Sequence, residues 1–409
     1  MEKHGKWSVF QSRFFQVSIC CLTNGVKGDT INRPLGGCKI GGKNVNILVT
    51  GCAGFIGSNY VPFFLRHHRD GKVIGLDKLT YSGNLENLKG VLENPRFVFV
   101  KGDICDPVLV EEVFRQHDID GVIHFAAESH VDRSIHDPQV FLRTNVLGTQ
   151  VLLEAAKKNW KKGDQWLSGK KFVQVSTDEV YGSLGKEGYF SERTPLDPHS
   201  PYSASKASAV FFMKAYHDTF GLPVNITRCS NNFGPYQFPE KLIPLMIRNA
   251  LSHEPLPVYG DGKQVRDWLY VVDHCQAIDL VFHQGRVGQV YNIGGNNERE
   301  NLDIVQVILE LVRRKTGDQE VGNHLIRHVQ DRLGHDRRYA IDSSKIRDEL
   351  GWEPSTSFEV GMEKTVQWYL EHSEWMEKVI SGEYVRFYAL NYGGKGEELN
   401  QPFREMNNK

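Results

Sequence analysis

The chain has 409 residues, of which 40% are hydrophobic and 24% are charged, so it can build one large or two ordinary globular domains. Its 49 basic and 50 acidic residues give a formal net charge of -1, which provides no overall field for nucleic acid or an anionic membrane. No apolar run approaches the ~20 residues of a membrane span. We therefore expect a small-molecule substrate.

The cysteine pattern bears on compartment and metal content. The seven cysteines are odd in number and include no C-x-x-C pair. This pattern is typical of reduced thiols in a cytosolic protein rather than of a disulfide framework or a zinc site. The sequence thus predicts a cytoplasmic protein with no bound metal.

Residues 1–43 differ in composition from the rest of the chain. Basic residues outnumber acidic ones there, and the segment ends in a glycine-rich stretch. We interpret it as a disordered or added extension, and a basic, acid-poor organellar transit peptide is the alternative.

An α/β pattern begins with a strand over residues 45–50. Glycines at intervals of three follow it at once and open a helical pattern. In this context glycines permit a tight turn, a close approach of a pyrophosphate to the backbone, and close packing of the helix on the sheet. We predict a dinucleotide-binding turn at Gly51, Gly54 and Gly57.

The next strand, over residues 72–76, ends in Asp77. A carboxylate in that place accepts a hydrogen bond from the adenosine ribose 2′-hydroxyl and repels a 2′-phosphate. Asp77 therefore predicts NAD rather than NADP. The alternative is that Asp77 only caps a turn.

The strand predicted over residues 96–100 leads into Asp103 and Ile104. A ligand lies outside the carboxyl ends of the strands in an open α/β sheet, so we expect these two residues beside the adenine.

The strand predicted over residues 121–125 leads into Ala126 and Ala127, whose small side chains let a dinucleotide lie against the backbone. His130 follows in the same segment. Its imidazole fits a substrate contact and a structural turn equally well.

A long helix is predicted over residues 138–159, followed by a polar loop over residues 157–170. Asn145 lies inside the helical pattern. A polar side chain that faces the sheet needs a hydrogen-bond partner there.

The strand over residues 172–176 is a short apolar run, which suits a buried strand of a parallel sheet. It ends in Thr177, Asp178 and Glu179. Because ligands bind where parallel strands end, a hydroxyl and an acid pair in this place indicate chemistry.

A helix is predicted over residues 202–220, directly after a proline-rich loop. The spacing of Tyr202 and Lys206 places the phenol and the ammonium on one face of this helix. The cation can then lower the pKa of the phenol and make it a usable base.

After the strand over residues 224–228 the pattern becomes irregular and turn-rich. Residues 258–262 are predicted to form a hairpin. Arginines concentrate at Arg266 and over residues 332–338. Forked hydrogen bonds from such arginines hold a diphosphate, and surface ion pairing is the alternative.

Taken together, these motifs resemble the extended short-chain dehydrogenase/reductase superfamily. They are T-G-x-x-G-x-x-G at residues 50–57, A-A-E-S-H-V-D-R-S at 126–134, S-T-D-E-V-Y-G at 176–182 and Y-S-A-S-K at 202–206. Three further motifs make the chain similar, over residues 45–370, to the dTDP-glucose 4,6-dehydratase family. They are S-N-N-F-G-P-Y-Q-F-P-E-K-L-I-P at 230–244, R-D-W-L-Y-V at 266–271 and D-R-L-G-H-D-R-R-Y at 331–339. Phe233 and Leu333 depart from the family's usual Tyr and Pro, and residues 1–43 have no counterpart.

The resemblance implies site residues by position. The implied NAD contacts are Gly51, Gly54, Phe55, Ile56, Gly57, Asp77, Lys78, Thr80, Asp103, Ile104, Ala126, Ala127, Ser129, Thr144, Tyr202, Lys206 and Asn231. The implied substrate contacts are Ser129, Thr177, Asn232, Lys241, Leu242, Pro257, Tyr259, Arg266, Asn301, Arg332 and His335. The family is usually dimeric, which implies pairing of helices at about 138–158 and 203–220.

The resemblance also implies catalytic roles. Tyr202, held as phenolate by Lys206, takes the proton of the sugar 4-OH, with Thr177 bonded to the same oxygen while NAD accepts the C4 hydride. Glu179 then removes the acidified C5 proton and protonated Asp178 donates to the leaving 6-OH, before hydride returns to C6. The product is a 4-keto-6-deoxy sugar nucleotide of deoxysugar (rhamnose-type) biosynthesis.

The expected fold is a Rossmann-type doubly wound parallel sheet with a smaller α/β substrate domain. We expect the extension over 1–43, an NAD domain over 44–228 with later strands returning from about 265–294, and a mainly substrate-binding domain over 229–409. The alternatives are a UDP-glucose 4,6-dehydratase and a sugar-nucleotide 4-epimerase or decarboxylase, of which the epimerases lack the acid pair. An NAD-binding regulatory protein on the same fold would be expected to have lost Tyr202 or Lys206.

Overall fold

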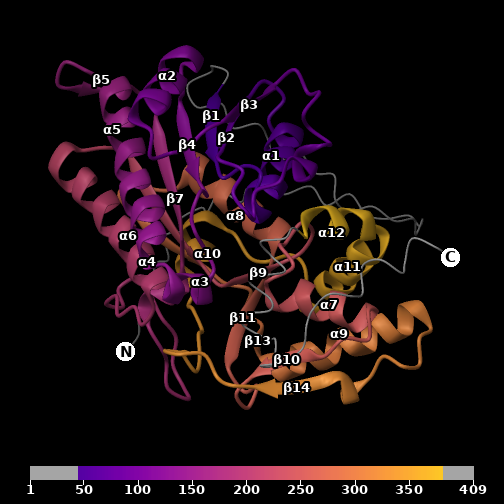
Figure 1. The fold of residues 1–409 in the computed structure, drawn as a ribbon. Helices are drawn as coiled ribbons and strands as arrows, with labels where there is room; N and C mark the ends of the chain where they lie inside the picture. Colours follow the sequence, from indigo (N-terminus) through magenta and orange to yellow (C-terminus); the bar gives the residue numbers. More distant parts are fainter. Residues whose placement is uncertain (1–44, 381–409) are drawn as a thin grey trace, which may run out of the picture. The chain divides into compact units, whose positions relative to one another are not determined.

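A computed structural model of the chain describes residues 45–380, so the extension predicted over 1–43 lies outside the described residues. The main sheet has seven strands in the order β12-β8-β7-β4-β1-β2-β3 (Figure 1), and every neighbouring pair is parallel. Its strands are β1 Asn46–Thr50, β2 Lys72–Asp77, β3 Phe97–Lys101, β4 Gly121–His124, β7 Lys171–Thr177, β8 Val224–Cys229 and β12 Val290–Ile293. The strand order reverses between β1 and β4, which opens a ligand crevice at their carboxyl ends.

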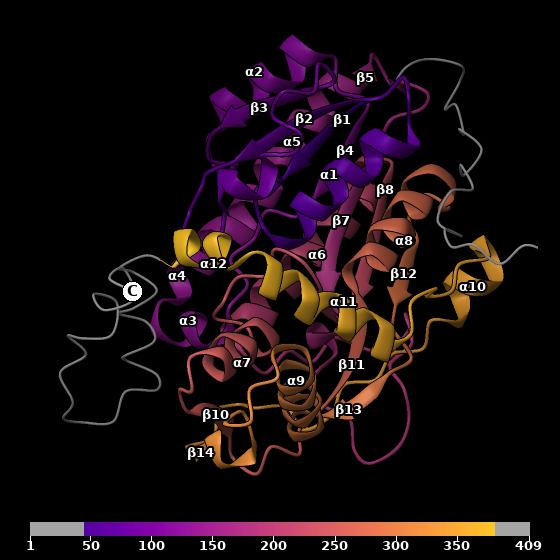
Figure 2. The same ribbon diagram turned by 90° about the vertical axis from the view of Figure 1, so that its right-hand side faces the viewer.

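Helices cover both faces of this sheet (Figures 1 and 2). Ile47 and Val49 of β1 belong to the hydrophobic cluster beneath α1 and α8, whereas Leu48 belongs to the cluster beneath α2, α5 and α6. Successive side chains of a strand point to opposite faces, so one apolar run feeds two cores. These helices are α1 Phe55–His67, α8 Val271–Gln284, α2 Pro107–His117, α5 Gly148–Trp160 and α6 Pro201–Phe220. The predicted doubly wound Rossmann-type fold is confirmed.

The long helix predicted over 138–159 is not a uniform α-helix. After α3 (Val131–His136) and α4 (Pro138–Phe141), residues Leu142–Leu147 form a π-helical segment, η2, and α5 continues from it to Trp160. Such wide turns often occur at functional sites. Asn145 lies in the wide turn, where its side chain faces inward.

Residues 157–170 were expected to be a loop, and this prediction is partly wrong. The α5 helix continues through Trp160, and β5 (Lys161–Lys162) then pairs with β6 (Gln165–Trp166) in a short antiparallel hairpin. Trp160 is fully buried and donates its indole N–H to the carbonyl of Ile119 at 2.7 Å, which holds the helix end in place.

A second group of elements lies below the main sheet in Figure 1. A three-stranded sheet has the order β13-β11-β9, and a separate parallel pair joins β10 to β14. Their bounds are β9 Asn231–Phe233, β10 Leu256–Tyr259, β11 Val265–Tyr270, β13 Glu298–Glu300 and β14 Ile326–Val329. Within residues 265–294, β12 therefore joins the main sheet and α8 packs on it, whereas β11 joins the small sheet.

The hairpin predicted at residues 258–262 is wrong. Gly260 and Gly262 do have positive φ angles, +55° and +72°, so the chain turns where expected. The flanking strands, however, pair with different partners, β10 with β14 and β11 with β9 and β13. Turn residues determine the reversal, but long-range packing determines the strand partner.

Helices fill the space around the small sheets. Phe233, Trp268 and Phe358 are buried in the hydrophobic cluster that joins these strands to the helices. The helices are α7 Leu242–Leu251, α9 Asn301–Thr316, α11 Phe358–Glu371 and α12 Ser373–Val379. A further helix, α10 Ser344–Leu350, lies beside β12 of the main sheet. The chain also forms the short 3-10 turns η1 Leu85–Leu88, η3 Asp178–Tyr181 and η4 Asn323–Leu325. Within residues 45–380, no helix combines the length and apolar character of a membrane span.

Candidate active site

The glycine turn joins β1 to α1 at the crevice. Gly51 has a φ of +69°, and a Cβ there would lie 2.6 Å from the backbone nitrogen of Ala126. A Cβ on Gly57 would lie 2.2 Å from the carbonyl oxygen of Gly51, so both positions exclude larger residues. Gly54 is the N-cap of α1, and the first N–H groups of a helix have no partner inside the helix. The turn therefore presents donors and a positive dipole end to the crevice, as an anion requires.

Asp77 ends β2 beside this turn and is 8% exposed. Its carboxylate accepts hydrogen bonds from the backbone N–H groups of Ala53 at 2.9 Å and Leu79 at 2.8 Å. Burial raises the pKa of Asp77, and the two backbone hydrogen bonds act in the opposite direction. Each oxygen keeps a lone pair for a ribose hydroxyl. The turn-capping alternative is thus also realised, because Asp77 holds the glycine turn together while it lines the crevice.

Asn145 has the partners that its burial demands. Its amide donates to the carbonyl of Glu128 at 3.0 Å and to the hydroxyl of Ser205 at 2.8 Å, and its carbonyl accepts from the N–H of Glu128 at 2.9 Å. One side chain in η2 therefore ties the segment after β4 to the first turns of α6. This fixes the helix that carries Tyr202 against the crevice.

Thr177, Asp178 and Glu179 lie where β7 ends and η3 begins. Thr177 is the N-cap of this turn, and its hydroxyl accepts from the N–H of Glu179 at 3.2 Å and donates to Asp178 Oδ1 at 3.1 Å. Asp178 is 1% exposed, and its Oδ2 has no hydrogen-bond partner among the described residues. A buried carboxyl oxygen without a partner, on the wall of a cavity, is suited to a substrate hydroxyl.

The two carboxyl groups differ in their surroundings. Burial, the charge of Glu179 and the charge of Asp267 raise the pKa of Asp178 well above 3.8. Burial also raises the pKa of Glu179, but the positive charges of Arg266, Lys241 and Arg332 act against it. Asp178 therefore stays protonated more readily than Glu179. Burial is the largest cause of the raised pKa of Asp178, ahead of the negative charge of Glu179.

Tyr202 and Lys206 stand in the first two turns of α6, which begins with a capping box formed by Ser200 and Ser203. Both side chains line the same crevice as the acid pair. Lys206 donates from Nζ to the carbonyl of Val175 at 2.7 Å, and burial lowers its pKa to about 8.

The expected lowering of the Tyr202 pKa is not seen. Burial raises the pKa of Tyr202 well above 10.0 and the charge of Glu179 raises it further, while a hydrogen bond from Thr177 acts in the opposite direction. The sequence showed that Tyr202 and Lys206 share a helix face. It did not show that both side chains are buried, which raises the pKa of the phenol.

A second cavity adjoins the crevice, and Glu179, Asn231 and Lys241 line both. Cationic groups are concentrated in it. Lys241 donates to the carbonyl of Ser129 at 2.7 Å, and Arg266 donates to the carbonyls of Val265 at 2.8 Å and Asp336 at 3.0 Å.

Arg332 belongs to the same cluster of positive charge. It forms a forked pair with Asp132, at 2.5 Å from Nε and 3.0 Å from Nη2, and Tyr259 donates to the same carboxylate at 3.1 Å. Arg337, by contrast, pairs with Asp261 on the surface. Arg338 likewise pairs with Glu298, so the ion-pair alternative describes both Arg337 and Arg338.

His130 lines the second cavity and is 3% exposed. Burial lowers its pKa well below 6.5, and the charges of Lys241, Arg332 and Arg133 lower it further. The imidazole is therefore neutral. Its position favours the substrate-contact interpretation.

The structure brings all the sequence-predicted residues to these two cavities. The crevice is lined by every predicted cofactor residue and by Thr177, Asp178, Glu179 and Asn232. The second cavity is lined by Ser129, Lys241, Leu242, Pro257, Tyr259, Arg266, Asn301, Arg332 and His335.

Sequence reasoning missed several residues of the lining. Glu240 lines both cavities, bonds Arg133 at 3.0 Å, and directly precedes the predicted Lys241, so that motif was a usable signal. Trp268 lies inside a quoted motif but was not assigned. Tyr339 lies beneath Arg266 at 4.1 Å and ends the quoted motif at 331–339, but it was not assigned a role.

The sheet, the glycine turn and the Tyr202–Lys206 face define an extended short-chain dehydrogenase/reductase. The chain belongs to the family described as GDP-mannose 4,6 dehydratase, whose family model matches residues 48–365.

Three comparisons place the chain more closely. It is 55% identical over 340 residues to a dTDP-glucose 4,6-dehydratase of Xanthomonas campestris pv. campestris, covering 82% of this chain and 96% of the relative. A solved dTDP-glucose 4,6-dehydratase of Bacillus anthracis in complex with NAD has a TM-score of 0.74 and 51% identity, covering 82% of this chain and 100% of that one. A Streptomyces venezuelae dTDP-glucose 4,6-dehydratase with NAD and dTDP bound has a TM-score of 0.76 and 47% identity, with the same shares of 82% and 100%.

Proposed function

We propose that this chain catalyses the NAD-dependent dehydration of dTDP-glucose to dTDP-4-keto-6-deoxyglucose, a step of deoxysugar biosynthesis of the rhamnose type. The single observation that carries the proposal is the acid pair at the end of β7, with Asp178 buried and Glu179 facing three cations. A dehydratase needs a proton donor and a proton acceptor side by side, whereas an epimerase has no elimination to perform. The relatives named dTDP-glucose 4,6-dehydratase support the substrate.

The residues of the crevice fit a dinucleotide. Gly51 and Gly57 leave no room for a Cβ, and the N-terminus of α1 supplies donors for the pyrophosphate. Asp77 and the predicted cofactor residues line the same crevice. When bound, NAD supplies a positively charged nicotinamide ring and exchanges hydride with the sugar at C4 and C6.

Tyr202 is the proposed base for the 4-OH. Burial raises its pKa, so the phenolate that takes the 4-OH proton needs positive charge beside it. The Thr177 hydroxyl acts to lower the pKa of the phenol, and Lys206 holds a positive charge fixed on Val175. These two residues lower the cost of the phenolate. Positioning and proton transfer are thus shared among three side chains.

Asp178 and Glu179 divide the elimination. Asp178 enters it protonated, because its burial disfavours the anion, and its unpartnered Oδ2 donates to the departing 6-OH. Glu179, kept nearer to the ionised form by Arg266, Lys241 and Arg332, removes the C5 proton. The atoms balance, because Glu179 gains the proton that leaves C5, Asp178 loses one to the 6-OH, and water departs.

The second cavity is the proposed nucleotide-diphosphate site. Arg266, Arg332 and Lys241 gather positive charge around it, and guanidinium groups bind phosphate oxygens by paired hydrogen bonds. Tyr259 and His335 lie among them, with ring centroids 6.1 Å apart. This cluster of cations is what a sugar nucleotide requires and a neutral sugar does not.

The test is to incubate the protein separately with dTDP-glucose and UDP-glucose and to follow the alkali-induced absorbance of a 4-keto sugar. We expect the signal with dTDP-glucose. A signal with UDP-glucose alone would assign the runner-up substrate. Interconversion of the two C4 epimers without any 4-keto product would place the chain with the epimerases.

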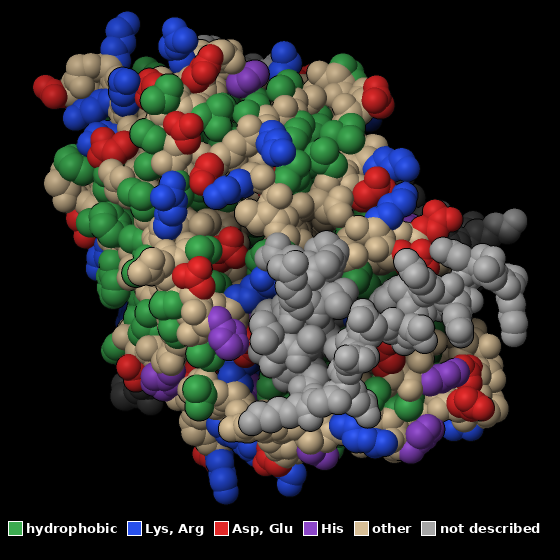
Figure 3. Space-filling view, in the orientation of Figure 1, with side chains coloured by type: hydrophobic (Ala, Val, Ile, Leu, Met, Phe, Trp, Pro, Cys, Tyr) green, Lys and Arg blue, Asp and Glu red, His purple; other side chains and the backbone are tan. Residues whose placement is uncertain are grey.

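The proposed assembly is a homodimer through η2, α5 and α6. Figure 3 shows hydrophobic side chains exposed on the left side, where these helices lie in Figure 1. Leu142 is 57% exposed and Phe211 is 59% exposed, which is unusual for large apolar residues on neighbouring helices. In light scattering, the wild type should have the mass of a dimer and Phe211→Asp should have the mass of a monomer. A monomeric wild type would contradict the assembly.

We further propose a cytoplasmic location and a functional division into an NAD part over residues 44–228, with later strands returning from about 265–294, and a mainly substrate-binding part over 229–409. The four cysteines in the described part of the chain are free, which supports a reducing compartment. The separate hydrophobic cluster around the small sheets supports the division. Fractionation of cells that express the full chain tests the location.

A further inference from the structure

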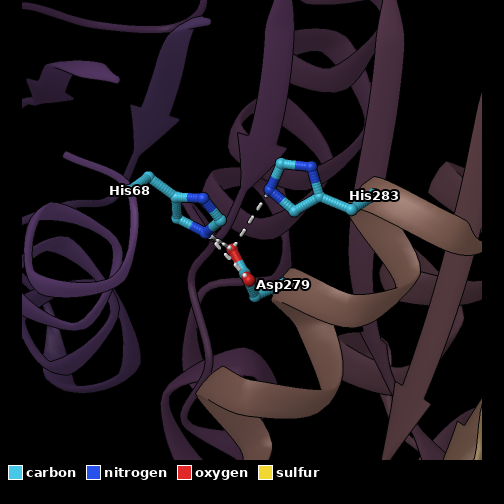
Figure 4. Close-up of side chains that lie close together, drawn as sticks. All are labelled: His68, Asp279 and His283. Carbon is cyan, nitrogen blue, oxygen red and sulfur yellow. Dashed lines mark hydrogen bonds and ion pairs between the residues drawn. The ribbon is translucent and has the colours of Figure 1, made fainter. Parts of the chain in front are cut away.

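Three side chains that take no part in the catalytic site meet between two helices on one face of the main sheet. His68 is the C-cap of α1, and Asp279 and His283 stand one turn apart on α8 (Figure 4). Residues four apart on a helix share a face, so Asp279 and His283 point together toward the end of α1. None of the three lines the crevice or the second cavity.

Their atoms lie close enough to share one ion. Nε2 of His68 is 3.0 Å from both oxygens of Asp279, and Nε2 of His283 is 3.6 Å from Oδ1. One ligand atom from each residue fits within a span of 4.8 Å. Zinc bonds to nitrogen and oxygen are about 2.0–2.2 Å long, which places neighbouring ligand atoms roughly 3.0–3.5 Å apart. Small rotations of the rings reach that geometry.

The ring nitrogens of His283, unpartnered in the described part of the chain, are a separate indication of a bound ligand. Its side chain is only 5% exposed, and neither ring nitrogen has a hydrogen-bond partner among the described residues. A buried imidazole without hydrogen bonds is unfavourable, and an ion at Nε2 would supply the missing partner. The side chain of His68 is 13% exposed, which leaves a way in from solvent.

We propose that His68, Asp279 and His283 form a binding site for a divalent transition-metal ion, with Zn²⁺ as the best match. Imidazole nitrogen selects zinc and its late first-row neighbours, whereas magnesium and calcium prefer sites made of oxygen. Three protein ligands leave a fourth position for water. On binding, His68 takes the tautomer with its proton on Nδ1, so that Nε2 is free to ligate.

The surroundings predict the strength and the role of the site. Tyr60 is fully buried and bonds Asp279 Oδ1 at 3.3 Å, which orients the carboxylate. Nδ1 of His283 has no such support among the described residues, so we expect binding about 10- to 100-fold weaker than at a fully supported site. An ion there would fasten the end of α1 to α8. The site would therefore stabilise the helix that begins at the glycine turn, without touching the reacting atoms.

The experiment uses the full chain after chelator treatment and dialysis, titrated with Zn²⁺ by calorimetry and with Co²⁺ by visible absorbance. The variants are His283→Gln and Asp279→Asn. The matched control is His324→Gln, because His324 is an exposed histidine in η4 that does not belong to the cluster. Circular dichroism and dehydratase activity check that each variant is folded.

We expect wild type and His324→Gln to bind one more equivalent of Zn²⁺ than His283→Gln or Asp279→Asn, and to unfold at a higher temperature when Zn²⁺ is present. The comparison between variants removes any binding by histidines and cysteines elsewhere in the chain. Equal stoichiometry in wild type and His283→Gln would overturn the proposal. An unfolding temperature that Zn²⁺ leaves unchanged in wild type would overturn it as well.

Discussion

Asp178 and Glu179 are adjacent in sequence, and burial raises the pKa of both, but only Glu179 has three positive charges that act against that effect. One carboxyl oxygen of Asp178 has no hydrogen-bond partner among residues 45–380, and burial and the negative charges of Glu179 and Asp267 raise the pKa of this group. Glu179 faces Arg266, Lys241 and Arg332, which oppose the effect of its burial. Neighbouring residues with diverging proton affinities are what an acid and a base in one elimination require.

The buried carboxyl of Asp178 should cost stability above the pH at which it ionises in the unfolded chain. Below pH 3.8 the group is protonated in both states, and above it the unfolded chain ionises first, so native stability falls until the raised folded pKa is passed. Asp178→Asn should therefore be more stable than wild type, by an amount that grows as the pH rises above 3.8. Thermal unfolding measures it.

The control for that comparison is Asp348→Asn, because Asp348 is exposed in a surface pair with Arg347. Any effect that is general to an Asp→Asn substitution should appear in this variant as well. If Asp178→Asn is less stable than wild type at pH 8, the carboxyl of Asp178 is not held in its protonated form.

Tyr202→Phe removes one hydroxyl and little volume. We expect the fold to be kept and oxidation at C4 to slow by roughly 10²- to 10⁴-fold, the range for a lost general base. Single-turnover absorbance at the NADH band measures this step. The control is Tyr216→Phe, since Tyr216 lies on the same helix but bonds Glu154 outside both cavities. A normal rate in Tyr202→Phe would mean that another residue is the base.

Asp77→Ala should weaken the preference for NAD over NADP, because the repulsion of a 2′-phosphate is lost. It should also lower stability, since Ala53 and Leu79 each lose an acceptor. Asp77→Asn is the control for charge, because its amide keeps one acceptor of similar shape. The ratio of kcat/KM for the two cofactors is the measurement. An unchanged ratio in both variants would remove the role assigned to Asp77.

Arg266→Lys should raise KM for the sugar nucleotide with a smaller effect on kcat. A lost charge-assisted hydrogen bond is worth about 1.5–3 kcal/mol, or about 10- to 100-fold in affinity. Arg337→Lys is the control, because Arg337 lies outside both cavities in an exposed pair with Asp261. Equal KM values for the two variants would argue against a diphosphate contact at Arg266.

Local features of the site were predictable from sequence. Gly51 and Gly57 belong to one short turn, so their role could be predicted from neighbouring residues. The helix face shared by Tyr202 and Lys206 follows from helix geometry alone. The pairing of β10 with β14 was not predictable, because the partner strand comes from a distant part of the chain. A turn motif contains no information about such a partner.

The difference in charge around Asp178 and Glu179 could likewise not be predicted from the residues next to them in the sequence. It depends on Arg266 and Arg332, which reach the site from elements far along the chain. The pairing of His68 with Asp279 spans 211 residues, and no spacing rule connects them. Residue types were visible in the sequence, whereas burial and charge around them came only with the fold.

The most direct test of the central claim compares Asp178→Asn and Glu179→Gln in single turnover, with the natural substrate and with its 6-fluoro analogue. Fluoride departs without a donated proton. We expect both variants to oxidise C4 and to accumulate NADH with dTDP-glucose, at an elimination rate at least about 10²-fold lower than wild type. With the 6-fluoro analogue as substrate, Asp178→Asn should recover much of the lost elimination rate and Glu179→Gln should not. Equal behaviour of the two variants with the fluoride would contradict the assignment of Asp178 as acid and Glu179 as base.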